Sequence, residues 1–211
     1  MMKGAALRRG LLLAGAAGAL AAASGLFIDY GLRAGTSFVP PAEDICVVAP
    51  SRVVAPHPYD PASGLGVHDP RPIPADARCP VCGMYPARFP RWAAQVIFND
   101  GAAHFFDSPV DLFMFLDAPE RFGTTRAAAD AVALYVADFD SGDWLSAREA
   151  VFVRGSAARG PMRGPDLPAF ADATAAQAHI AQQGGQALRF GQIDRGVVAG
   201  LRDATHAQHL H

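Results

Sequence analysis

The chain has 211 residues, of which 51% are hydrophobic and 18% are charged, and its formal net charge at pH 7 is −2. This composition is too apolar for a disordered chain and too weakly charged for a basic nucleic-acid-binding protein, so no nucleic acid partner is expected. Three cysteines are too few for a disulfide-stapled small domain. The length suits one domain, or two small ones, with a hydrophobic core.

The first 30 residues are typical of a targeting segment. Lys3, Arg8 and Arg9 come first, and residues 10–28 carry no charge. At 1.5 Å per residue, a helix over this uncharged stretch nearly crosses a hydrocarbon core of roughly 30 Å. The paired arginines are typical of a twin-arginine export signal, and the positive flank keeps the N-terminus cytoplasmic. We therefore expect residues 1–30 to be an export signal or a single anchor. The rest of the chain would be periplasmic, attached to the inner membrane through residues 10–28 if the signal is not cleaved.

Residues 31–77 are predicted to form an extended spacer. Prolines recur in this stretch from Pro40 to Pro74. Proline lacks an amide donor and restricts the residue before it to extended backbone, so a regular helix is excluded here. We expect the spacer to carry the folded domain away from a membrane surface.

The folded domain is predicted over residues 78–195. The turn residues Asn99, Asp100 and Gly101 predict a hairpin of two strands at 92–98 and 102–106. Ser108 and Pro109 then suit the N-cap and first position of a helix that Pro119 ends. Further along the chain we expect strands at 131–139 and 150–154, a helix at 172–183 and a last strand at 186–190. Strands paired mainly by hairpins, with helices between them, indicate an α+β fold.

The last residues, 196–211, are predicted to be a flexible tail. They contain three closely spaced histidines, His206, His209 and His211. A histidine-rich terminus of this kind has a composition able to bind metal.

A cysteine motif stands just before the first predicted core strand. Cys79 and Cys82 are three positions apart, and Gly83 and Met84 follow directly. Glycine permits the tight turn that lets two thiols converge on one point. Soft sulfur ligands select Cu(I), and a thioether distinguishes Cu(I) from zinc, which prefers thiolate, imidazole or carboxylate. The motif therefore predicts a Cu(I) site, and His104, on the return strand of the neighbouring hairpin, is a candidate further ligand.

Other interpretations of the same motif stay open. Cys79 and Cys82 could form a disulfide or act as the redox pair of a periplasmic thiol–disulfide oxidoreductase. A thioredoxin-like site, however, places its motif between a strand and a helix, whereas this one follows a spacer. A structural zinc site needs four ligands, and no second Cys-x-x-Cys is present. The third cysteine, Cys46, has no assigned role. No nucleophile elbow or phosphate-binding loop occurs, so we expect no enzyme activity.

Over roughly residues 78–193 the sequence resembles the NosL family, the accessory proteins of nitrous-oxide reductase. Several separated blocks carry the resemblance in the expected order: Cys82-Gly83-Met84, Phe98-Asn99-Asp100-Gly101, Phe106-Asp107-Ser108, Tyr135-Val136-Ala137-Asp138, Trp144, the Ala-Arg-Glu-Ala of residues 147–150, Gly160-Pro161-Met162 and Pro168-Ala169-Phe170. The resemblance implies a periplasmic Cu(I) metallochaperone that delivers copper for maturation of nitrous-oxide reductase. By the same resemblance, the protein's expected partner is that reductase or the reductase's assembly machinery. The resemblance also implies a compact fold of two small, related ββα-type units.

The resemblance further implies a ligand set. Cys82 and Met84 match the metal motif of the family, and Met162 is the second methionine that the family pattern places in a later loop. Cys79 is an additional thiol, either a ligand or a disulfide partner of Cys82. Members of the family are commonly lipoproteins, whereas this sequence has no lipid-attachment cysteine after its apolar segment. A single helical anchor could substitute for the lipid.

Overall fold

The computed structural model describes residues 53–209, so the predicted export segment and Cys46 lie outside the described residues. Within residues 53–209, no helix is both long and apolar enough to cross a membrane. Besides the α-helices and strands described below, this part of the chain has short 3₁₀-helices: η2 (Pro61–Ser63), η3 (Pro86–Arg88), η4 (Pro119–Phe122), η5 (Ala128–Asp130) and η6 (Phe190–Gln192).

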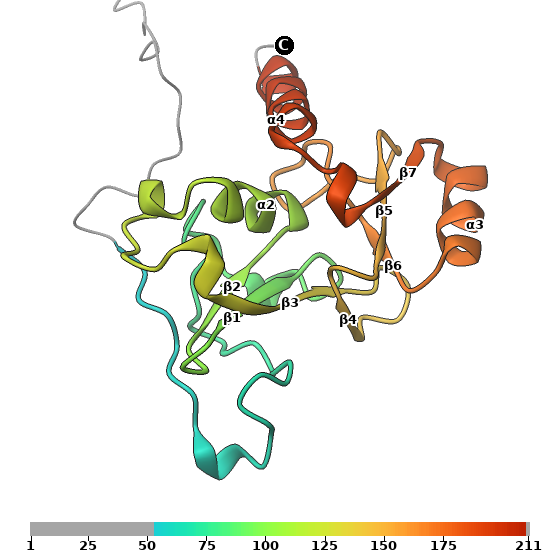
Figure 1. Cartoon of the computed structure of the whole chain (residues 1–211). Coiled ribbons are helices and arrows are strands. Elements are labelled where there is room, and N and C mark those ends of the chain that lie inside the picture. Colours follow the sequence, from blue (N-terminus) through green and yellow to red (C-terminus); the bar gives the residue numbers. More distant parts are fainter. Residues whose placement is uncertain (1–52, 210–211) are drawn as a thin grey trace, which may run out of the picture. The chain divides into compact units, whose positions relative to one another are not determined.

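The first sheet is antiparallel and is centred on the predicted hairpin. Its strands are β1 (Ala94–Phe98), β2 (Ala103–Phe106), β3 (Ala131–Ala137) and β4 (Trp144–Ser146), in the order β2-β1-β3-β4 (Figure 1). The hairpin turn contains Gly101 at φ +80°, a backbone conformation that glycine adopts without strain. The amide of Phe98 donates to the carbonyl of Ala102 at 2.9 Å and closes the turn. The prediction of the hairpin is confirmed.

Helix α2 (Pro109–Asp117) covers one face of this sheet. The Ser108 hydroxyl accepts a hydrogen bond from the amide of Asp111 at 3.2 Å, as the N-cap prediction requires. Leu112 and Phe115 of α2 are buried in the same core cluster as Val96 of β1. The helix is therefore fixed at its first turn by a cap and along its length by the sheet.

Residues 53–77 cover the opposite face of the sheet, so they do not form a separate spacer in the described part of the chain. His57 and Ala103 exchange two backbone hydrogen bonds, of 2.7 and 2.8 Å. The side-chain amide of Gln95 binds the backbone of Arg71 through two hydrogen bonds of 3.2 Å. The segment packs here because this face of the sheet carries apolar side chains that need cover: Ile97, Ala103 and Phe105.

The second sheet repeats the topology of the first. Its strands β5 (Val151–Arg154), β6 (Ala169–Phe170) and β7 (Gln186–Arg189) lie in the order β6-β5-β7, with β5 antiparallel to both neighbours. Helix α3 (Ala173–Gln183) lies between β6 and β7 in the chain and begins at Asp172, whose carboxylate accepts from the amide of Ala175 at 2.9 Å. The first sheet has the same order of strand, strand, helix and strand, formed by β1, β2, α2 and β3. Here β1 lies between its two antiparallel partners, β2 and β3. The predicted α+β fold of two ββα-type units is confirmed.

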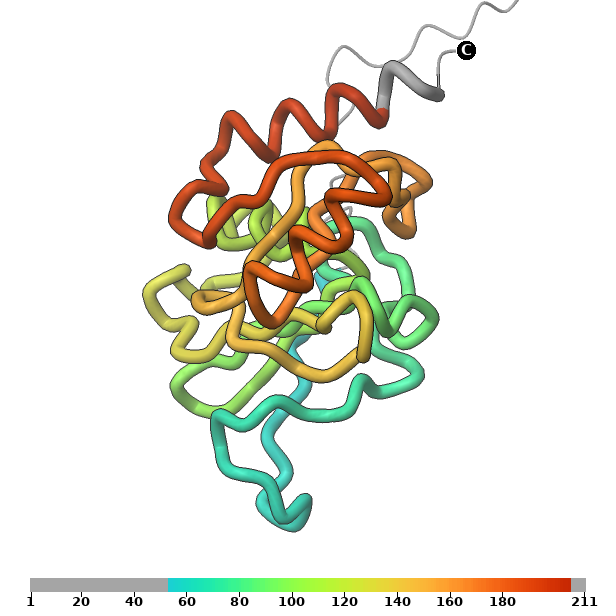
Figure 2. Tube along the Cα trace, turned by 90° about the vertical axis from the view of Figure 1, so that its right-hand side faces the viewer, coloured from blue at the N-terminus to red at the C-terminus, as the bar shows by residue number. Residues whose placement is uncertain are grey.

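The C-terminal residues form a helix where a flexible tail was predicted. Helix α4 spans Arg195–His209 and packs against α2 (Figure 2). The carboxylate of Asp194 accepts from the amide of Val197 at 2.9 Å and so caps the first turn. Val198 and Leu201, three positions apart on one face, are only 8% and 4% exposed. Burial of this apolar stripe stabilises the helix.

Candidate metal centre

The cysteine motif forms a tight turn in front of β1. The amide of Cys79 donates to the carbonyl of Met84 at 2.9 Å, and the amide of Gly83 donates to the carbonyl of Cys79 at 2.9 Å. Gly83 has φ +76°, so the turn requires a residue that tolerates left-handed backbone. The two hydrogen bonds bring both thiols to the same side of the chain.

Each thiol donates a hydrogen bond to a carboxylate at the start of α2. Cys82 Sγ donates to Asp107 Oδ1 at 2.9 Å, and Cys79 Sγ donates to Asp111 Oδ2 at 3.2 Å. One ligand atom from each of these four residues lies within 4.8 Å of all the others. The arrangement is a four-residue cluster of two sulfurs and two carboxylates, which we call the Cys–Asp centre.

The Cys–Asp centre is buried on one side and open on the other. The side chains of Cys79 and Asp107 are fully buried, whereas Cys82 is half-buried. Asp107 Oδ2 is buried and has no hydrogen-bond partner among the described residues. A ligand could therefore reach the centre past Cys82.

Burial and the carboxylates keep the thiols protonated. Burial raises the pKa of Cys79 well above its usual value. A hydrogen bond with Cys79 lowers the pKa of Cys82, but burial and the nearby Asp111 and Asp107 carboxylates outweigh it and raise that pKa to about 12. Burial, and then the charge of Asp107, raise the pKa of Asp111 to about 7. Any metal bound by sulfur must therefore displace protons from the thiols.

Neither carboxylate of the centre was predicted from the sequence. Asp107 directly follows β2, and Asp111 lies in the first turn of α2. Asp107 stands directly before the N-cap Ser108 and Asp111 three residues after it, and this grouping of two carboxylates around a helix start is the signal that could have found them. An acidic residue in a first helical turn is also common for helix stability alone, so the sequence pattern is not specific.

The loop that carries Met162 is attached to the start of α2 by Asp166. This carboxylate is 6% exposed and accepts from the amides of Val110, at 3.4 Å, and Leu167, at 2.8 Å. Burial raises its pKa to about 7. Met162 is 40% exposed and Met84 is half-buried. The structure thus holds the Met162 loop to the same helix end that carries the Cys–Asp centre, and the ligand roles of both methionines remain predictions.

His104 is not one of the residues of the Cys–Asp centre. It lies on β2 with its side chain 1% exposed, and its ring is edge-on to Phe98 and Phe115 at centroid distances of 5.8 and 5.3 Å. Neither ring nitrogen has a hydrogen-bond partner among the described residues. Burial lowers its pKa to about 4. The structure therefore places His104 in an aromatic core, and its role as a ligand remains a prediction.

Comparison with known proteins agrees with this fold. A family model described as NosL matches residues 70–198. The copper-binding lipoprotein NosL of Stutzerimonas stutzeri is 30% identical over 139 residues, covering 62% of this chain and 67% of that protein. The copper-binding lipoprotein NosL of Achromobacter cycloclastes is 29% identical over 128 residues, covering 56% of this chain and 63% of that protein. The crystal structure of the copper chaperone NosL from Shewanella denitrificans superimposes with a TM-score of 0.52 and 26% identity, covering 61% of this chain and 98% of that one. The chain belongs to the NosL family.

Proposed function

We propose that this protein is a periplasmic Cu(I) chaperone that binds copper at the Cys–Asp centre. The convergence of two thiols with two carboxylates within 4.8 Å is the observation that carries the proposal. Sulfur donors suit Cu(I), and the names of the similar proteins, copper-binding lipoprotein and copper chaperone, support the choice of metal. Cys79 and Cys82 supply thiolates, and Met84 and Met162 are the candidate thioethers.

The two carboxylates act on the protons of the thiols. Cu(I) binds thiolate, so each coordinating cysteine must lose the proton that it donates to Asp107 or Asp111. These carboxylates are already hydrogen-bonded to the sulfurs and provide a path for the protons. A protonated Asp111 also limits the negative charge that two thiolates would create in a buried site.

Delivery of copper depends on the open side of the centre. Cys79 is fully buried, whereas Cys82 is half-buried and accessible to the sulfur ligand of another protein. An acceptor could bind the ion at Cys82 while Cys79 still holds it, and then replace the remaining ligands one by one. Nitrous-oxide reductase or its assembly machinery is the proposed acceptor. No covalent change of a substrate is involved, so the protein is not an enzyme under this proposal.

A thiol–disulfide oxidoreductase is the second candidate, because the two sulfur atoms are close enough to form a disulfide after small side-chain movements. A catalytic cysteine of such an enzyme needs a lowered pKa, since the thiolate is the nucleophile. The pKa of Cys82 is instead raised to about 12. The raised pKa therefore counts against redox catalysis, whereas Cu(I) can displace the thiol proton as it binds.

An anaerobic titration with Cu(I) against a competing chelator tests the proposal. We expect one Cu(I) per chain, and we expect Cys82→Ser to weaken binding by more than about 100-fold, beyond the loss typical of a second-sphere contact. Met84→Leu and Met162→Leu should also weaken binding without altering any disulfide reductase activity. Ser141→Ala, in a turn outside the centre, serves as the control. Unchanged Cu(I) affinity in the cysteine variants, or disulfide reductase turnover that requires both cysteines, would refute the proposal.

A further inference from the structure

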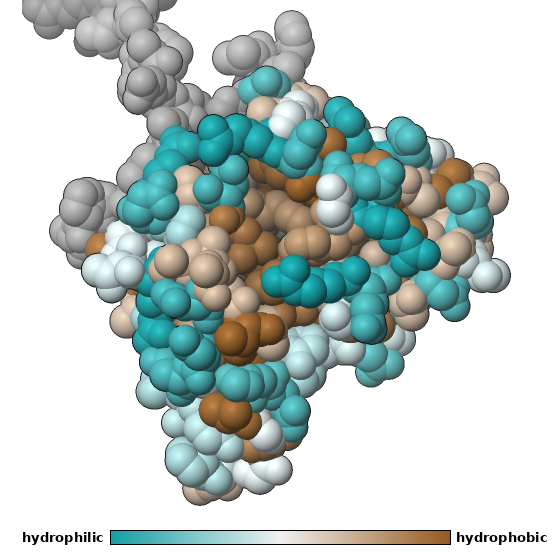
Figure 3. Space-filling view, in the orientation of Figure 1, coloured by the Kyte–Doolittle hydropathy of each residue, from teal (hydrophilic) through white to brown (hydrophobic). Residues whose placement is uncertain are grey.

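A cavity between α2, η4 and α4 is separate from the Cys–Asp centre. Its volume is about 610 Å³, and none of its lining residues belongs to the four residues of that centre. Sites for small ligands typically have volumes of roughly 300–1,000 Å³. Figure 3 shows the face that contains it, where an apolar hollow is bordered by hydrophilic side chains.

Besides its charged residues, the cavity has a wall that is apolar and partly aromatic. Phe113 of α2 and Phe190 of η6 meet at a centroid distance of 5.1 Å at one end. Further apolar side chains continue the surface: Leu116, Phe122, Ile193 and Val198. Phe190 and Leu116 are only partly buried, so an apolar ligand would remove their exposed surface from water.

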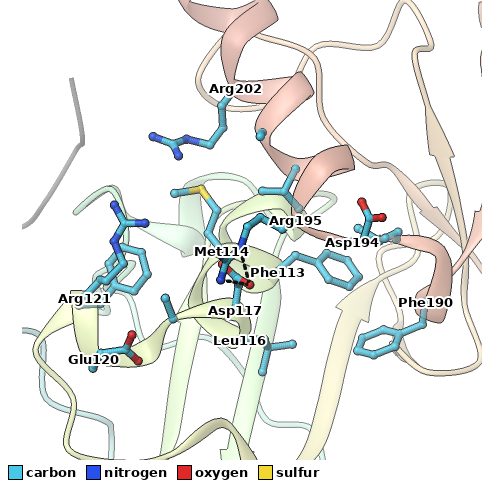
Figure 4. A pocket seen from close by; sticks show the side chains of 15 residues that line it. Phe113, Met114, Leu116, Asp117, Glu120, Arg121, Phe190, Asp194, Arg195 and Arg202 are labelled. Carbon is cyan, nitrogen blue, oxygen red and sulfur yellow. Dashed lines mark hydrogen bonds and ion pairs between the residues drawn. The ribbon is translucent and has the colours of Figure 1, made fainter. Parts of the chain in front are cut away.

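Two arginines lie at the other end of the cavity. Arg121 of η4 and Arg202 of α4 flank the side chain of Met114 (Figure 4). In the described part of the chain, neither guanidinium forms an ion pair. Arg195, by contrast, is bound to Asp117 at 3.0 Å. The Arg121–Arg202 end therefore carries positive charge without a neutralising partner.

The acidic residues that line the cavity do not neutralise this end. Asp117 is paired with Arg195, and Asp194 caps the first turn of α4. Glu120 forms no ion pair among the described residues, and it lies at the opposite side of the view from Arg202 (Figure 4). The cavity is thus polarised, with positive charge at one end and aromatic rings at the other.

We propose that this cavity binds a long-chain carboxylate, an anionic amphiphile of the fatty-acid class. Its carboxylate would lie between Arg121 and Arg202, because guanidinium groups bind carboxylates through paired, charge-assisted hydrogen bonds. Its aliphatic chain would extend over Met114 toward Phe113 and Phe190. The proposal is independent of copper binding, since the two sites share no residue.

Calorimetric titration of the full chain with dodecanoate, below the concentration at which it forms micelles, tests the proposal. We expect one dodecanoate per chain, with binding by acetate and by dodecyltrimethylammonium at least about tenfold weaker, because one lacks the chain and the other the negative charge. Equal binding of the anionic and cationic amphiphiles would overturn the proposal. So would binding of an acidic helical peptide in the absence of any dodecanoate binding.

Variants locate the ligand in the cavity. The double substitution Arg121→Gln and Arg202→Gln should weaken dodecanoate binding by about tenfold or more, since it removes both charge-assisted contacts. Met114→Glu should have a similar effect by placing a tethered carboxylate between the arginines, whereas Met114→Gln, which adds no charge, should weaken binding much less. Arg154→Gln, which removes one positive charge on β5 outside the cavity, is the control for a general effect of charge and should bind dodecanoate like the wild type. Cys82→Ser should retain full dodecanoate binding. Unchanged affinity in the double arginine variant and in Met114→Glu would exclude this cavity as the site.

Discussion

Asp107 and Asp111 link the protonation of the Cys–Asp centre to the binding of copper. Each carboxylate accepts a hydrogen bond from one thiol, and burial raises the pKa of Asp111 to about 7. Asp111 is therefore protonated below about pH 7 and ionised above it. Only the ionised form can take up a proton that a thiol releases.

This linkage predicts a change of slope in the pH dependence of Cu(I) affinity. Because the pKa of Cys82 is raised to about 12 and that of Cys79 is also raised, both thiols lose protons on binding throughout the neutral range. Below about pH 7 both protons go to solvent, so the Kd should rise about 100-fold for each unit that the pH falls. Above about pH 7 the ionised Asp111 takes up one of the two protons that the thiols release. The Kd for Cu(I) should then change only about tenfold for each pH unit.

Competition titrations at several pH values measure this slope. The amide in Asp111→Asn cannot take up a proton. In this variant the slope of log Kd for Cu(I) against pH should therefore be the same on both sides of pH 7. Asp143→Asn, in the turn between β3 and β4, is the matched control and should behave like the wild type. An affinity that is independent of pH, or a break that persists in Asp111→Asn, would contradict the linkage.

His104 should make the folded protein less stable in mild acid. Its pKa is lowered to about 4 from 6.5 by burial, so between these values the unfolded chain binds a proton that the folded chain does not. The free energy of unfolding therefore falls as the pH falls through this range, by about 2 kcal/mol at pH 5 relative to pH 8 from this residue. His104→Leu, of similar volume, should remove that loss.

Urea denaturation at both pH values compares the two proteins. The buried carboxylates Asp111 and Asp166 have raised pKa values and act in the opposite direction, but they are present in both proteins and cancel in the difference. If the free energy of unfolding changes with pH by the same amount in His104→Leu and in the wild type, His104 is not held neutral in the core.

Among the elements, α4 makes the firmest prediction about stability. Leu201 is 4% exposed and belongs to the core cluster shared with α2, so Leu201→Ala should lower the free energy of unfolding by about 2–5 kcal/mol. Asp203→Ala, exposed on the same helix, should change it by less than about 0.5 kcal/mol. Urea denaturation measures both variants. An effect of Leu201→Ala as small as that of Asp203→Ala would mean that α4 does not pack on the domain.

The elements that the sequence could predict have local signals. The β1–β2 hairpin has its turn residues, and α2 and α3 have the capping residues Ser108 and Asp172. Strands β4 and β6 are only three and two residues long, too short to show an alternating pattern. Helix α4 contains two glycines, which lower its intrinsic helix propensity, so it depends on its packing as well as on the Asp194 cap.

The candidate centre could be predicted from the sequence only in part. The thiols of Cys79 and Cys82 share one short motif, so their proximity follows from the sequence. The carboxylates that bind them come from the residue after β2 and from the first turn of α2. Asp107 and Asp111 are 25 and 32 residues away from their thiol partners. Such contacts depend on how the hairpin and helix return to the motif, which local patterns do not specify. The strand position of His104 directs its ring into the aromatic core, an orientation that the sequence pattern does not specify.

In the whole molecule, two copies of one topology meet near the candidate metal centre. The first half, β1 to β4 with α2, carries the Cys–Asp centre, and the second half, β5 to β7 with α3, carries the Met162 loop before β6. Asp166 connects this loop to the amide of Val110 at the start of α2, and Phe113 and Phe152 join the halves at a centroid distance of 5.4 Å. Copper ligands from both halves would make the metal a bridge between them.

X-ray absorption at the copper edge of the Cu(I)-loaded protein tests the central claim most directly, because it identifies the atoms bound to the metal. We predict a first shell of up to four sulfur atoms, from Cys79, Cys82, Met84 and Met162, with one sulfur lost in Met162→Leu and one in Cys82→Ser. A first shell dominated by oxygen or nitrogen, or a sulfur shell that is the same in both variants and the wild type, would contradict it.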